Sequence, residues 1–294
     1  MKARILLIAA LFLAACQPVD DIITVPDDVT PSDGKMTLTI QATKGDAGTK
    51  ALDLHENTMR PYWTSSDKVQ VYKDGSFLCE IGVTPDTGEK PQTATLTGTF
   101  DGTLAQKDEL TLLIPRTVWD YTGQKGTLTG TSSIEDTYDY ATATVKVQNR
   151  EGNNFTTTAA NFQNEQSIYR FTINNLPSGA SIQEFTVSSA NNSLVQQVAW
   201  GGIEAKTGSI QVTPAGADGP YFVALRNNST AADNYGFQII ANVGTTTGAL
   251  FLASKNIPAD ALAAPGKFLS ATLSATQPDF SPASGEINSS TAVL

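Results

Sequence analysis

The chain has 294 residues and a formal net charge of −10 at pH 7, and only 16% of its residues are charged. This acidic balance excludes a nucleic-acid partner, because phosphate backbones are bound by basic surfaces. The length allows one large or two medium domains with adequate cores, and the abundance of Thr, Ser, Asn, Gly and Ala favours an exported β-protein over a cytosolic enzyme.

The N-terminus has the layout of an export signal. Two basic residues precede an apolar stretch, 5–13, which is too short for a bilayer-spanning helix of roughly 20 residues. The segment Leu13-Ala14-Ala15-Cys16 resembles the bacterial lipobox. That resemblance implies cleavage between Ala15 and Cys16 and acylation of Cys16, and two or more acyl chains hold a protein stably on a membrane. Residues 1–15 are therefore predicted to be a lipoprotein signal peptide; the alternative is an ordinary signal peptide with an incidental cysteine.

Residues 16–35 are predicted to form a polar, proline-containing tether between the membrane and the first domain. Asp20 and Asp21 follow closely after Cys16, and they resemble the surface-export signal of Bacteroidales lipoproteins. A solvated linker is the alternative interpretation of these two carboxylates. The expectation is a lipoprotein of the cell outer membrane that is exposed on the cell surface.

Strand signals begin at residue 36. Apolar and polar residues alternate in MTLTIQAT, residues 36–43, and similar runs follow between turns rich in Gly, Pro and Asp, which predicts antiparallel strands. A Gly- and Thr-rich excursion at 116–140 interrupts the pattern, and residues 36–152 are predicted to be an N-terminal β-sandwich. The predicted strands of this half are 36–43, 68–72, 77–82, 93–100, 109–115 and 141–148.

A polar stretch near 150–160 marks the predicted domain boundary, after which the strand pattern resumes. Residues 258–266 suggest a short helix. The close spacing of strands predicts a C-terminal β-sandwich at 153–275, followed by a tail at 276–294, so the fold class is all-β. The predicted strands of this half are 167–173, 182–190, 194–200, 209–214, 221–226, 235–243, 248–254 and 267–275.

No set of residues in the sequence predicts catalysis. His55 is the only histidine, and Cys79 is the only cysteine outside the lipobox, so a zinc site lacks ligands. A Ser-His-Asp triad would have to use His55, which lies in the polar turn DLHEN and is expected to be a surface histidine. Cys79 is expected to be buried as a small hydrophobe. Glu135, Asp136 and Asp139 are close enough in sequence to suggest a glycosidase pair, but carboxylates in a Thr-rich loop are usually solvated. We expect no enzyme activity, no metal and no cofactor.

The stretch 49–75, TKALDLHENTMRPYWTSSDKVQVYKDG, resembles the opening of the fimbrillin-like surface lipoproteins of Bacteroidales, the type V pilus family. The matching positions are the Thr49-Lys50 step, Trp63, Asp67 and the hydrophobic strand 69–72. Three later stretches agree with the family in their order: YDYATATV, NEQSIYRFTI and APGKFLSATLSA. One position departs from it, because Ser66 stands where the family usually has Gly.

This resemblance implies two tandem transthyretin-like β-sandwich domains and a structural or adhesive role in a pilus. In that family a surface protease removes the first strand, and a strand of another subunit takes its place by pairing with the exposed edges. Here the removable strand would be 36–43, with cleavage at Lys44, Lys50 or Arg60; Pro61 disfavours the last. The implied partners are other pilus subunits through donor-strand exchange, the outer membrane, and surface receptors or glycans of host or bacteria.

The position of the subunit within the pilus follows from its tail. The segment INSSTAVL, 287–294, would present a weakly apolar face and is a poor donor strand, so a tip, anchor or accessory role is preferred over a shaft role. The alternative function is a surface glycan-binding lipoprotein. In that alternative, aromatic side chains of the excursion between Trp119 and Tyr140 would stack on sugar rings.

Overall fold

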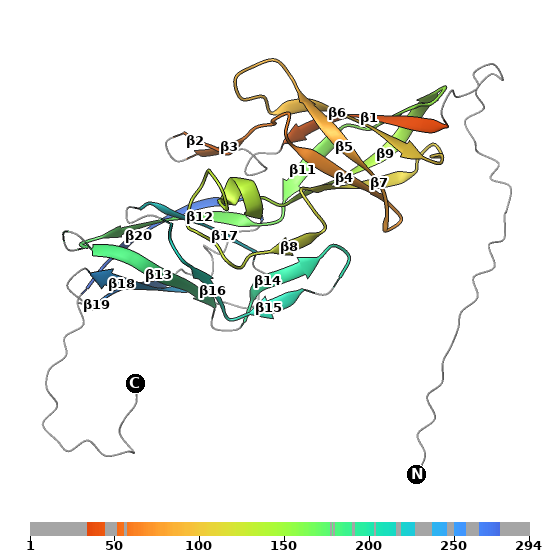
Figure 1. Cartoon of the computed structure of the whole chain (residues 1–294). Coiled ribbons are helices and arrows are strands. Elements are labelled where there is room, and N and C mark those ends of the chain that lie inside the picture. Colours follow the sequence, from red (N-terminus) through yellow and green to blue (C-terminus); the bar gives the residue numbers. More distant parts are fainter. Residues whose placement is uncertain are drawn as a thin grey trace, which may run out of the picture.

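The computed structural model describes residues 34–44, 52–55, 58–176, 178, 180–189, 192–202, 204–215, 219–226, 237–245, 250–256 and 265–276. Within these ranges the chain is mostly β-strand, and its helical element is one π-helical turn, η1 (Ile134–Tyr138), which confirms the expected all-β fold (Figure 1). The helix expected at 258–266 lies outside the described residues except for Pro265 and Gly266, which are part of a turn.

The first sheet has eight strands and closes on itself. The hydrogen-bonded pairs lead from β1 through β6, β5, β4, β7 and β9 to β10 and β11, both of which pair with β1 again. Its strands are β1 (Lys35–Lys44), β4 (Lys68–Lys73), β5 (Ser76–Pro85), β6 (Thr93–Asp101), β7 (Glu109–Ile114), β9 (Ala141–Glu151), β10 (Asn154–Thr157) and β11 (Ala160–Asn164). Closure lets every strand turn one face toward a shared interior.

The interior of the first sheet is one apolar cluster. The period-two pattern of β1 directs Leu38, Ile40 and Ala42 into it, each at most 3% exposed. Trp63, from the segment before β4, meets Phe162 of β11 edge to face, with ring centroids 5.4 Å apart. The alternation in the sequence therefore decides which face of β1 contacts the core.

The second half contains two sheets that face each other across a separate core. β17 (Tyr221–Leu225), β12 (Ser167–Asn174) and β20 (Phe268–Ser274) form one sheet, in which β12 and β20 run parallel. β16 (Ser209–Val212), β13 (Ala180–Ser189), β18 (Phe237–Thr245) and β19 (Leu250–Asn256) form the other, with antiparallel pairs. Phe171 of β12 packs edge to face on Phe185 of β13, with ring centroids 5.9 Å apart.

A third small sheet connects the two halves of the sequence. β8 (Val118–Asp120), which follows β7, pairs antiparallel with β14 (Leu194–Ala199), and β14 also pairs with β15 (Ala205–Thr207). The hairpin of β2 (Leu52–His55) and β3 (Thr58–Pro61) places Met59 in the core of the second half. Segments from the first half of the sequence thus complete the second core.

The observed strands include a counterpart of every strand predicted from the sequence. The structure adds the short strands β2, β3, β8, β10, β11 and β15. Because β10 and β11 pair with β9 and β1, the first sheet continues to Asn164, past the boundary predicted at residue 152.

Candidate functional site

β1 is hydrogen-bonded along both of its edges. On one edge it runs antiparallel to β6, with Thr37 opposite Thr99. On the other edge it runs parallel first to β10 and then to β11, with Thr37 opposite Asn154 and Ala42 opposite Ala160. β1 is therefore the strand that closes the sheet, and its removal would leave a slot between β6 and the β10–β11 pair. We call this the β1 slot.

The last residue of β1 is a buried cation. The inward alternation of the strand continues to Lys44, whose side chain is 0% exposed. Its Nζ lies 3.1 Å from Asp67 Oδ2 and donates a hydrogen bond to the carbonyl oxygen of Tyr62 at 2.6 Å. It also lies 4.3 Å from the centroid of the Trp63 ring. Such additional contacts offset the hydration that a buried ion pair loses.

Asp67 is held in place by contacts that do not involve β1. The backbone amide of Thr64 donates to Asp67 Oδ2 at 3.1 Å, and the Thr64 hydroxyl donates to Oδ1 at 2.9 Å. The Asp67 side chain is 1% exposed. Since these contacts lie within the turn before β4, the carboxylate is positioned at the end of the β1 slot by the body of the sheet.

The three predicted processing residues differ in their surroundings. Lys44 is buried and ion-paired, so a protease could reach it only after local opening. Arg60 is exposed in β3, where it lies opposite Asp53 in the β2–β3 hairpin and is followed by Pro61. Lys50 lies outside the described residues. Of the three, Arg60 is the one that the structure shows at the surface.

The residues predicted to govern export lie outside the described residues. These are the cleavage positions Ala15 and Cys16 and the acidic pair Asp20 and Asp21. Within the described ranges, no helix combines the length and the apolar character that crossing a bilayer requires.

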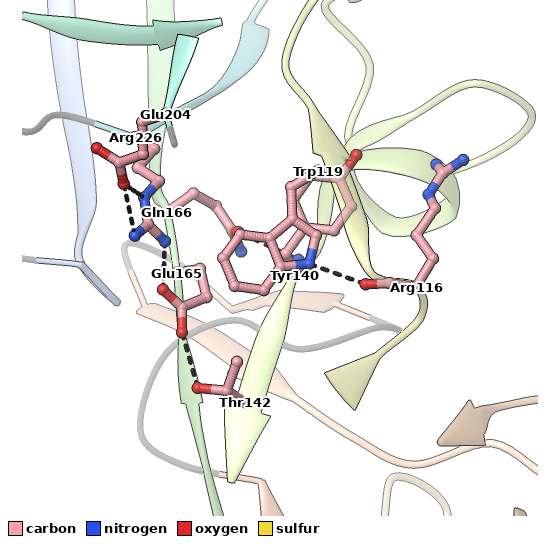
Figure 2. A network of polar contacts seen from close by, with 8 residues as sticks. All are labelled: Arg116, Trp119, Tyr140, Thr142, Glu165, Gln166, Glu204 and Arg226. Carbon is pink, nitrogen blue, oxygen red and sulfur yellow. Dashed lines mark hydrogen bonds and ion pairs between the residues drawn. The ribbon is translucent and has the colours of Figure 1, made fainter. Parts of the chain in front are cut away.

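A polar network joins the first sheet to the second half of the chain (Figure 2). Arg226, just after β17, is ion-paired with Glu165, which follows β11, and with Glu204 at 2.9 Å. Glu165 also accepts a hydrogen bond from the hydroxyl of Thr142 in β9 at 2.7 Å. Burial lowers the pKa of the Arg226 guanidinium, but the charge of Glu165 and other anionic groups outweighs burial and raises the pKa overall. The network therefore keeps Arg226 charged and links the two halves.

A pocket of about 460 Å³ lies beside this network. Glu165, Glu204 and Arg226 line it together with Trp200. Trp200 is the first member of an aromatic cluster on the surface: its ring centroid is 5.0 Å from that of Tyr72, and Tyr72 is 5.5 Å from Phe77. Phe77 is 57% exposed. The sequence does not reveal this cluster, because its members come from β4, β5 and the turn after β14. The one signal in the sequence is the aromatic residue Phe77 close to the KDG turn.

The aromatic residues that would stack on sugars in the glycan-binding alternative are buried. Trp119, Tyr121, Tyr138 and Tyr140 are at most 4% exposed, and all four belong to the core of the second half. Trp119 and Tyr140 stack on each other with ring centroids 5.9 Å apart (Figure 2). The alternative in which these side chains form a glycan-binding surface is therefore wrong, because the excursion folds onto an apolar core and buries its aromatic rings.

The acidic residues of the excursion have structural partners. Asp136 Oδ2 accepts a hydrogen bond from the Ser132 amide at 3.0 Å, next to η1. Asp139 is 1% exposed and accepts from the side-chain amide of Gln166 at 3.1 Å. No group of three or more His, Cys, Asp or Glu side chains that could hold a metal occurs in the part of the chain that the structure describes. Cys79 is buried as expected, and burial raises the pKa of its thiol to about 11.

Comparison with known proteins gave structural likenesses only. No family model matches the chain, and no curated protein matches it. A candidate cell adhesion protein from Bacteroides uniformis is 14% identical, with a TM-score of 0.43 over 86% of this chain and 100% of its own. One from Bacteroides ovatus is 12% identical, with a TM-score of 0.41 over 82% and 95%.

The tip fimbrial protein Mfa3 from Porphyromonas gingivalis, in a C-terminally truncated form, is 10% identical. Its TM-score is 0.35, over 76% of this chain and 81% of its own. The solved structures that resemble this chain thus include candidate adhesion proteins and a fimbrial tip protein. Since these TM-scores lie below 0.5, the likeness by itself assigns neither a family nor a function.

Proposed function

We propose that this chain is a non-enzymatic structural or adhesive component of a type V pilus, displayed on the outer membrane through a lipid on Cys16. Its subunits would join by β-strand exchange at the β1 slot. The observation that supports this proposal is the position of β1, which closes the first sheet through both edges. The proposed architecture is two tandem transthyretin-like β-sandwich domains. We propose that the first domain ends at Asn164, because the last strand of the first sheet ends there.

The physical basis is strand addition to an open sheet. Without β1, backbone N–H and C=O groups of β6 and of the β10–β11 pair would lose their partners, and such edges bind an extended strand. The loss of Leu38, Ile40 and Ala42 would also uncover apolar surface, at about 25 cal/mol per Å². The opened sheet would therefore bind a replacement strand from another subunit.

We infer a tip, anchor or accessory position rather than a shaft position. The tail 287–294 alternates apolar residues with Ser and Thr, and it would fill the slot less well than β1 does. In this position the chain would contact other pilus subunits on one side, and a surface receptor or glycan of host or bacterial origin on the other.

Limited proteolysis of the purified chain tests this function. We expect a cut between Lys44 and Trp63, after which the cut chain forms no ladder of its own oligomers but takes up a strand from a different pilus subunit when that subunit is added. A ladder that deletion of residues 287–294 abolishes would make the chain a shaft subunit. If the cut chain neither releases β1 nor accepts any strand, strand exchange is wrong.

A surface glycan-binding role is the second candidate, and one observation favours it. The exposed Phe77 extends the Tyr72–Trp200 pair beside the pocket lined by Glu204 and Arg226, which combines aromatic faces with polar side chains. Binding of the purified chain to a glycan array tests it. Phe77→Ala should abolish a specific signal, whereas Val118→Ala, at another exposed apolar side chain, should leave it unchanged.

A further inference from the structure

We infer that the strand which replaces β1 carries a basic side chain at the position of Lys44, and that Asp67 selects for this side chain. The inference rests on the strand exchange proposed above and adds to it the chemistry of the partner. The partner is then a protein other than a second copy of this chain that has also lost β1.

The β1 slot imposes a pattern on any strand that enters in the same register. Four inward positions alternate along β1, and they are occupied by Leu38, Ile40, Ala42 and Lys44. The first three contact the apolar core, so a replacement needs apolar side chains there, with a small one at the third position. The fourth position faces Asp67 instead of the core.

The acceptors for a basic side chain remain in the body of the sheet when β1 leaves. Asp67 is bonded to Thr64, and the carbonyl of Tyr62 and the ring of Trp63 lie beside it. A strand with an apolar or neutral residue at the fourth position would bury the Asp67 carboxylate without its cation. Removing one partner of a buried ion pair is far more costly than the pair is favourable, so this one position discriminates strongly between donors.

The tail of this chain does not meet the requirement. No Lys or Arg follows Lys267 in the sequence, so neither face of the segment 287–294 can present a cation. The sequence KMTLTIQATK of β1, by contrast, has the required spacing of three apolar residues and a terminal Lys on one face. A second copy that has also lost β1 keeps only this tail as a free strand, so it lacks the complementary charge for Asp67, whereas a foreign strand with the spacing of β1 fits.

Peptide exchange on a nicked chain tests the inference. A recognition site for a sequence-specific protease is inserted between Gly48 and Thr49 of residues 17–294, and the folded chain is cut there so that β1 remains bound without a covalent link. Fluorescent peptides then compete with β1. The peptides are KMTLTIQATK, its Lys44→Arg and Lys44→Met forms, the control Lys35→Met form, and INSSTAVL.

We expect the unaltered peptide, the Lys44→Arg peptide and the Lys35→Met control to enter with affinities within about tenfold of one another. The Lys44→Met peptide should bind about a hundredfold more weakly or worse, and INSSTAVL should not enter. In a nicked chain that carries Asp67→Asn, the difference in affinity between the unaltered peptide and the Lys44→Met peptide should shrink to less than about tenfold.

Two different failures are distinguishable. If no peptide enters the nicked chain, strand exchange and the present inference are both wrong. If the Lys44→Met peptide enters as well as the unaltered one, or if the Lys35→Met control loses as much affinity, strand exchange stands and the selection by Asp67 is wrong. The comparison between peptides uses the nicked chain with Asp67 in place, so it does not depend on the folding of the Asp67→Asn variant.

Discussion

The side-chain amide of Gln124 forms a two-bond pair with the backbone of Ala224. Gln124 Nε2 donates to the Ala224 carbonyl at 2.8 Å, and Gln124 Oε1 accepts from the Ala224 amide at 2.8 Å. Gln124 is 0% exposed, so one side chain from the excursion satisfies both backbone groups of a residue in β17. The pair fixes the excursion on the core of the second half.

Gln124→Leu should lower the free energy of unfolding by about 2–4 kcal/mol, because the substitution leaves the amide and the carbonyl of Ala224 buried without partners. Urea denaturation monitored by tryptophan fluorescence measures this. The control is Gln106→Leu, which removes an exposed hydrogen bond to Gln148 and should cost less than about 0.5 kcal/mol. Equal losses for the two variants would contradict the role of the pair.

Gly98→Ala should destabilise the first sheet by about 1–3 kcal/mol. A Cβ at this position in β6 would lie 2.5 Å from Cγ2 and 3.0 Å from Cα of Ile81 in β5, and the latter is backbone that cannot move alone. The matched control is Gly82→Ala in β5, where the nearest atom is the Thr97 carbonyl oxygen at 3.8 Å. Thermal unfolding of the two variants side by side should separate them, and a neutral Gly98→Ala would show that β5 and β6 are less closely packed.

Two buried tyrosines should respond in opposite ways to loss of the hydroxyl. Among the described residues the Tyr121 hydroxyl has no hydrogen-bond partner, whereas the Tyr138 hydroxyl donates to the Thr122 carbonyl at 2.8 Å. Tyr121→Phe should leave stability unchanged or raise it, and Tyr138→Phe should lower it by about 1 kcal/mol. Denaturation at pH 8 measures both, and a loss of stability in Tyr121→Phe would mean that its hydroxyl is satisfied.

The same tyrosines predict alkaline loss of stability. Burial raises the pKa of Tyr121 above its ordinary value of 10.0, and it raises the pKa of Tyr138 to about 12. The folded state therefore holds these protons more tightly than the unfolded state. The contribution of these two protonated tyrosines to the free energy of unfolding is complete below pH 10, and it is lost as the pH rises toward 12. Denaturation midpoints between pH 9 and pH 11.5, roughly the range in which unfolded tyrosine ionises, should fall less steeply in Tyr138→Phe than in the unaltered chain.

Cys16→Ala should release the chain from membranes, because the acyl chains on Cys16 would be its anchor. Partitioning between detergent and aqueous phases after expression in a bacterial host measures this. Cys79→Ala is the control, since that thiol is buried in the first sheet and should not affect partitioning. Unchanged membrane retention of the Cys16→Ala variant would contradict lipidation at this residue.

The local pattern of the sequence predicts where strands form, but it does not predict which strands pair with each other over long separations. The alternation in MTLTIQAT predicts β1 because a period of two is a property of neighbouring residues. The short strand β8 is not predicted, since its pairing partner β14 follows only after β9 to β13 in the chain. For the same reason the sequence does not reveal that the aromatic ring of Trp119 packs in the core of the second half.

The candidate site is predictable only in part. The family resemblance singles out Asp67 and Trp63, but it does not reveal which cation lies beside the carboxylate. Lys44 is predicted as a cleavage position. It falls on the same alternating positions of the strand as Leu38, Ile40 and Ala42, so it could have been assigned to the inward face. A lysine that continues an apolar alternation is a usable signal for a buried pair, provided that an acidic partner can be identified in space.

The two edges of β1 cannot form at the same stage of chain synthesis. Thr37 pairs with Thr99 on one edge and with Asn154 on the other, so the second edge has no partner until the chain through β11 has emerged. Closure over such a long separation is slow, and an open edge in the meantime is prone to aggregation. A fragment that ends at residue 152 would retain this open edge permanently, whereas a fragment that ends after Asn164 contains every strand of the sheet. Recombinant production of the first half alone should therefore succeed or fail according to whether residues 153–164 are included.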